Sequence, residues 1–224
     1  MLGVRIRFVL TAAALVAAGC AAALAVEDEP GTSRWPIKTT VPAGADVERP
    51  RDVPLVSLLA LGTVPRVRGN DPRYQTQRIP AEAFDNLLGL KEGDIVKTAG
   101  WLHVVAREPD GDYHLQIAVG QDNQVRCLIV AAPNPDPRFK VPASLQPVMA
   151  AVRDEIEEHL EGANLTGQRW VYKLKNPIYV NVTGQLFYDA AHVKVDGSIE
   201  ARGHHGCHSP TLWELHPVTD VSYF

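Results

Sequence analysis

Histidines gather near the C-terminal end of the chain, in a stretch that could hold a metal ion. The stretch RGHHGCHSPTLWELHP (202–217) contains four of the eight histidines and one of the three cysteines. Imidazole and thiolate are ligands that zinc and copper accept. We therefore consider a zinc or copper site formed by the closely spaced side chains of His204, His205 and His208, with Cys207 between them. Adjacent histidines point apart in most conformations, and the spacing matches no standard zinc motif. A polar loop is therefore the alternative.

A second set of polar side chains is spread over predicted strands. His114 and Gln116 alternate with apolar neighbours, and so do Glu214 and His216. Residues two apart in a strand share a face, so these four side chains are candidates for a ligand-binding face. Ordinary solvent-facing residues are the alternative interpretation.

Some of the same side chains could instead carry out chemistry. Histidines and carboxylates serve as general bases and as ligands of catalytic metals. A metal-assisted hydrolase, which could be a nuclease, would use His114, Asp189, His192 and His216. The sequence contains no Gly-x-Ser-x-Gly motif and no phosphate-binding glycine loop, which argues against serine hydrolases and P-loop enzymes.

The N-terminal segment predicts export. Residues 1–25 begin with Arg5 and Arg7, continue as an apolar run and precede the acidic EDEP. This is the pattern of a signal peptide. Two cleavage sites compete: AAGC would make Cys20 a lipidated first residue, and ALA (23–25) would be an ordinary cleavage site. An uncleaved membrane anchor is the third possibility. The membrane is thus a partner only through a lipidated or uncleaved N-terminus.

Charge argues against a nucleic-acid partner. The whole chain carries a formal net charge of −4, with 22 basic and 26 acidic residues. Loss of Arg5 and Arg7 with the signal would leave 20 basic residues and a net charge of −6. Nucleic-acid affinity depends largely on lysine and arginine, so the partner is expected to be another ligand or an envelope protein.

Hydrophobic periodicity predicts the order of the elements. Alternating residues indicate strands, and apolar residues three and four apart indicate one long helix. A short helix, or a turn followed by a helix, is also expected over 79–93. The predicted strands cover 94–108, 113–120, 125–133, 178–190 and 211–224, and the long helix covers 144–162, with Ser144 as its N-cap. Gly100 suggests a bulge or a sharp coil in the long first strand.

This order predicts a mainly β fold with one long helix. Three strands, a helix and two strands describe an OB-like five-stranded barrel, and a four-stranded sheet with a packed helix is the alternative. We expect an export or lipoprotein signal over 1–25, an extended arm or linker over 26–78, and the barrel domain over 79–224.

The barrel hypothesis also predicts a disulfide. Strands three and five lie side by side in an OB barrel, and Cys127 and Cys207 fall in or near them. An exported protein meets an oxidising environment in which disulfides persist. The bond would close a loop of about eighty residues and stabilise the fold by roughly 4 kcal/mol. Cys207 would then fasten the histidine-rich loop instead of binding a metal.

Four segments resemble a group of exported bacterial proteins with no established activity. They are RWPIKT (34–39), DGDYHL (110–115), VTGQLFYDAAH (182–192) and LWELHPVTDV (212–221). The resemblance implies export and a small barrel, and it assigns no catalytic residue. The HHGCH cluster is not part of the shared pattern. The resulting hypothesis is an exported or envelope-anchored barrel protein that binds an unknown ligand or partner.

Overall fold

A computed structural model describes residues 34–65, 67, 71–122, 126–160, 163–194 and 196–224. The predicted signal over 1–25, with Cys20, lies outside the described residues. Among those residues, no helix is both long enough and apolar enough to cross a membrane.

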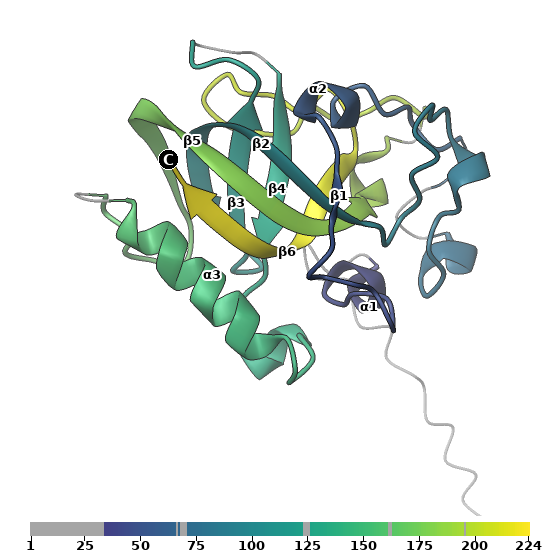
Figure 1. The fold of residues 1–224 in the computed structure, drawn as a ribbon, viewed down its shortest axis with the longest axis horizontal. Coiled ribbons are helices and arrows are strands. Elements are labelled where there is room, and N and C mark those ends of the chain that lie inside the picture. Colours follow the sequence, from purple (N-terminus) through teal and green to yellow (C-terminus); the bar gives the residue numbers. More distant parts are fainter. Residues whose placement is uncertain (1–33, 66, 68–70, 123–125, 161–162, 195) are drawn as a thin grey trace, which may run out of the picture.

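The protein is mainly β, as the sequence predicted (Figure 1). Its strands are β1 (Arg51–Asp52), β2 (Ile95–Arg107), β3 (Tyr113–Ala118), β4 (Cys127–Ala132), β5 (Trp170–Tyr188) and β6 (Trp213–Tyr223). The α-helices are α1 (Trp35–Lys38), α2 (Leu55–Leu58) and α3 (Gln146–Glu158). The 3-10 turns are Pro72–Tyr74, Ala81–Ala83, Pro137–Phe139 and Ala190–His192. The order of three long strands, a helix and two strands is confirmed.

The strands form one six-stranded sheet in the order β1-β2-β3-β4-β6-β5, and β2 also pairs with β5. Most pairs are antiparallel, whereas β1–β2 and β4–β6 are parallel. In Figure 1, β2 and β5 are long and strongly curved, and α3 lies along one side of the sheet. Met149, Val152 and Ile156 are the buried apolar residues of this helix.

Several local predictions need correction. The expected helix over 79–93 is only a three-residue turn, Ala81–Ala83. Asn86 explains part of this, because its side chain bonds both the N–H and the carbonyl of Leu90 and so competes with helical hydrogen bonds. The N-cap of α3 is Leu145, without a side-chain hydrogen bond, instead of Ser144.

The bulge in β2 lies after Leu102 and not at Gly100. The register shifts between Leu102 and Val104, on both the β3 side and the β5 side. Gly100 has a different role. A Cβ there would lie 2.6 Å from a methyl carbon of Leu55 and 2.8 Å from the carbonyl oxygen of Ala118. Glycine therefore lets α2 pack closely against β2.

The described part of the predicted arm packs on the domain. Leu55 and Leu58 of α2 belong to the main hydrophobic core. Arg34 fastens the start of this segment, because its guanidinium binds both carboxylate oxygens of Glu92 at 2.6 Å. Glu92 also accepts hydrogen bonds from the N–H groups of Ile79 and Tyr188. The buried charges thus have their polar partners, as a stable buried ion pair requires.

Candidate functional site

The polar face of β3 is covered. Gln116 is fully buried and His114 is partly buried. The loop from Gly203 to His208 covers this face, since Gln116 donates to the carbonyls of Cys207 (2.8 Å) and His204 (3.1 Å) and accepts from the N–H of His204 (2.7 Å). The face is therefore an interior polar layer instead of a solvent-exposed surface.

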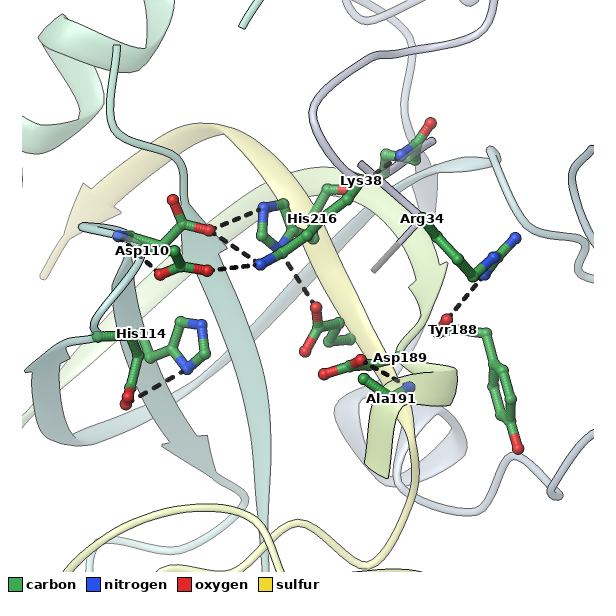
Figure 2. A network of polar contacts seen from close by, with 12 residues as sticks. Arg34, Lys38, Asp110, His114, Tyr188, Asp189, Ala191 and His216 are labelled. Carbon is green, nitrogen blue, oxygen red and sulfur yellow. Dashed lines mark hydrogen bonds and ion pairs between the residues drawn. The ribbon is translucent and has the colours of Figure 1, made fainter. Parts of the chain in front are cut away.

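Lys38, at the end of α1, enters this polar layer. Its Nζ lies 2.9 Å from Oδ2 of Asp110 and 3.2 Å from Oδ2 of Asp112, and Figure 2 shows the side chain reaching toward Asp110 and His216. Burial disfavours the charged amine, but the carboxylates of Asp112, Asp110, Glu214 and Asp189 together outweigh burial and raise the pKa of Lys38 above its usual value. Lys38 belongs to the RWPIKT segment, and no pattern in the sequence predicted that it would join the site.

His216 and Glu214 continue the layer on β6. His216 is fully buried. Its Nε2 lies 3.4 Å from Oδ2 of Asp112, and its Nδ1 lies 3.2 Å from Oε1 of Glu214. Burial alone would raise the pKa of Glu214, but Arg202 and His216 lower it far below the usual value of a carboxyl group. Glu214 is therefore negatively charged at neutral and mildly acidic pH.

Arg202 joins two carboxylates. Its NH2 pairs with Oε2 of Glu214 and lies 3.3 Å from Oδ2 of Asp189. His192 contacts the same carboxylate, with 3.3 Å between the imidazole Nε2 and Oδ2 of Asp189. Asp189 also caps the turn at Ala191. In Figure 2, Asp189 lies close to the turn at Ala191 and toward Tyr188, whereas His114 and Asp110 lie on the opposite side of His216.

Glu108, in the turn after β2, binds two histidines. Its Oε1 lies 2.8 Å from Nε2 of His204 and 3.7 Å from Nδ1 of His114. Burial raises the pKa of Glu108, and the histidines and Arg169 more than compensate, so the net change is downward. Burial lowers the pKa of His114, so its imidazole is neutral near pH 7.

A small cavity opens beside these groups. Its volume is about 240 Å³, and it is lined by Glu108, His114, Gln116, Ile129, Arg169, His192, Glu200, Ala201, Arg202, Gly203 and His204. Three nitrogens of the lining residues are buried and have no hydrogen-bond partner among the described residues: Nε2 of His114, NH1 of Arg202 and Nδ1 of His192. Nδ1 of His192 lies 3.5 Å from Oε2 of Glu200, so the other two are the nitrogens without a nearby carboxylate partner of their own. Such nitrogens are uncommon in folded proteins and need an explanation.

A larger groove of about 650 Å³ lies elsewhere, between residues 42–51 and 78–95. Several of its charged groups already have partners: Asp46 pairs with Arg49 at 2.5 Å, and Glu92 with Arg34. We place the candidate site at the smaller cavity, because the chemically active side chains converge there.

The structure brings together most of the residues that the sequence singled out. His114, Gln116, Asp189, His192, Glu214 and His216 all belong to this network or border the cavity. The loop histidines do not stay together, since His204 binds Glu108 whereas His205 and His208 are exposed. Within the described ranges, no three His, Cys, Asp or Glu side chains are grouped so that they could hold a metal ion.

Cys127 and Cys207 form a disulfide, as predicted, with 5.5 Å between their alpha carbons. The Cys207 sulfur is therefore bonded to Cys127. A buried disulfide agrees with folding in an oxidising environment. The sequence matches no protein-family model and no curated protein.

Proposed function

We propose that the protein is an exported OB-like barrel protein that binds a small ligand in the cavity between His114 and Arg202. The strand pairings support the barrel, because β2, β3, β4, β6 and β5 pair in succession and β5 pairs again with β2. This circular order is that of a small Greek-key barrel. The short strand β1 is additional to these five strands and pairs in parallel with Val96 and Lys97 of β2.

The unpaired nitrogens carry the proposal. A buried polar group without a partner costs free energy, and His114 and Arg202 each present one beside the same cavity. A ligand with matching polar atoms would satisfy both. The residues around them are held by ion pairs and by the disulfide-fastened loop, so the site is preorganised.

Export and anchoring complete the proposal. The signal pattern over 1–25 and the buried disulfide both support a location outside the cytoplasm. Cys20 would anchor the chain in the envelope if it is lipidated. In that case the cavity would face the periplasm or the exterior, where an envelope partner could also deliver the ligand.

The experiment is a binding screen by NMR on the disulfide-bonded protein. Mixtures of neutral sugars, carboxylic acids, amines and phosphate esters are added in turn, and amide shifts are followed. We expect one class to move the amides of His204 and its neighbours. The shift should be lost in His114→Phe and kept in His208→Phe, whose side chain is exposed. No shift with any class would refute the proposal.

A second candidate function is hydrolysis with His114 as general base. Its neutral imidazole has Nδ1 3.7 Å from Glu108 and Nε2 without a hydrogen-bond partner, which resembles a catalytic histidine–carboxylate pair. His192 and Asp189 border the same region, whereas His216 is fully buried and would only position its neighbours. Turnover of an ester, glycoside or phosphodiester that disappears in His114→Phe, with or without added zinc, would favour the enzyme.

A further inference from the structure

We propose that the ligand of this cavity is neutral and polyhydroxylated, and that Arg202 and His114 bind neighbouring hydroxyl groups of a sugar ring. This inference rests on the proposed function, that the cavity is a binding site. It follows from which atoms are unpaired and from how the surrounding charges are balanced.

Arg202 requires an oxygen acceptor. The side chain is only 4% exposed, and its NH2 is held by Glu214 and Asp189. NH1 has no acceptor in the described part of the chain. A guanidinium nitrogen can only donate, so the missing partner is an oxygen with a free lone pair.

His114 requires a donor. Its imidazole is neutral near pH 7, because burial lowers the pKa. Nδ1 faces Glu108, and a carboxylate there favours the tautomer with hydrogen on Nδ1. The unpaired Nε2 is then an acceptor. A hydroxyl group can both donate and accept, so two neighbouring hydroxyls satisfy His114 and Arg202 together.

The charges around the cavity disfavour an ionic ligand. The charge of Arg202 is already offset by Glu214 and Asp189, and Arg169 lies 3.9 Å from Glu108. An added anion would face the carboxylates of Glu108 and Glu200, while both arginines of the lining, Arg169 and Arg202, already lie beside carboxylates. An added cation would face the N–H groups of Arg202. A neutral ligand avoids both penalties.

The size of the cavity agrees with one ring. A volume of about 240 Å³ corresponds to roughly eight water molecules. It lies just below the range of roughly 300–1,000 Å³ that is typical of drug-sized ligands. Arg169 is 62% exposed and marks the open side, where a longer chain could leave the cavity. A free monosaccharide and the terminal ring of an oligosaccharide present the same hydroxyls.

Isothermal titration with matched sugars tests the inference. Glucose, glucuronate and glucosamine share one ring but are neutral, negative and positive, and galactose, galacturonate and galactosamine form a second set. We expect the neutral sugar of at least one set to bind at least tenfold more tightly than its charged relatives. His114→Phe should weaken it at least fivefold, with His208→Phe as the matched control. Maltotriose and a galactose-terminated trisaccharide are titrated as well. If one of them binds more tightly than the free sugar, the ligand is the terminal ring of an oligosaccharide.

Each contrary outcome is distinguishable. If a charged sugar or a non-sugar binds best and His114→Phe abolishes that binding, the cavity is a binding site but the neutral-sugar inference is wrong. If neither these sugars nor the compounds of the NMR screen bind, the proposed function fails as well. If His114→Phe does not fold, the wild-type ring nitrogens decide the question, because glucose or galactose must shift Nε2 of His114. An unshifted Nε2 at saturating sugar overturns the inference.

Discussion

Nζ of Lys38 lies 2.9 Å from Oδ2 of Asp110, although 72 residues separate them in the sequence. This contact joins the segment before the sheet to the turn between β2 and β3. Through Asp112 and His216 it reaches β6, so residues from three distant segments depend on one another for their charge balance.

Replacing Lys38 with methionine should destabilise the protein strongly. The substitution keeps most of the side-chain volume but leaves Asp110 and Asp112 buried beside each other without the ammonium group. Breaking a buried ion pair in this way costs about 3–5 kcal/mol. Denaturant unfolding measures the change, and Lys175→Met, at an exposed position of β5, is the matched control. Equal stability of the two variants would show that Lys38 does not compensate the carboxylates.

Stability should fall in acid, and Glu214 should contribute to the fall. The pKa of Glu214 is lower in the folded protein than the usual 4.5. Its contribution to the free energy of unfolding is therefore complete above about pH 4.5 and is lost as the pH falls toward the pKa of the folded protein. The lowered pKa of His114 acts in the same direction below about pH 6.5, because unfolding lets the ring take up a proton.

Urea midpoints between pH 3 and pH 7 measure this dependence. Glu214→Gln should lower stability at pH 7 and flatten the slope below pH 4.5, whereas Glu82→Gln, at an exposed position, should leave the slope unchanged. A slope as steep in Glu214→Gln as in the wild type would contradict the assignment.

The disulfide should stabilise the folded protein by several kcal/mol. It should also hold the loop from Gly203 to His208 beside the cavity. It spans 80 residues, for which the chain-entropy estimate is about 4 kcal/mol. Cys127→Ala with Cys207→Ala should lose roughly that amount. Hydrogen exchange at His204 should also become faster, because the loop would be held mainly by Gln116. Non-reducing peptide mapping that finds two free thiols in exported wild-type protein would contradict the bond.

Export should leave a defined N-terminus. Mass spectrometry of protein purified from the producing cell is expected to find either lipidated Cys20 or a chain that begins at Val26. The lipidated form should fractionate with membranes, and a Cys20→Ser variant should abolish the lipid. A cytoplasmic protein that retains Met1 would rule out export.

The sequence predicted the strands better than the surroundings of the site. The alternation in β3 and β6 is regular, so their bounds are close to those predicted. The first part of β5 was missed, because Lys173, Lys175 and Pro177 make residues 170–177 look like a loop. Strand periodicity identified the polar face of His114 and His216, but it could not show that the face is covered.

Hydrophobic periodicity cannot predict which distant segments of the chain meet in the fold. Lys38 belongs to a four-residue helix far from β3 in the sequence, and only the fold places it between Asp110 and Asp112. Arg202 lies in a loop whose position depends on Gln116 and the disulfide. Ligand spacing within HHGCH pointed to a metal, whereas the fold gives His204 and Cys207 other partners.

The most direct test of the binding site is the protonation state of the two His114 ring nitrogens. Long-range proton–nitrogen NMR at pH 7 measures it. We predict a neutral ring with hydrogen on Nδ1 and a bare Nε2. The Nε2 resonance should move when the best-binding sugar is added, while the ring of exposed His208 stays unchanged. A ring protonated at Nε2 that no ligand perturbs would contradict this prediction.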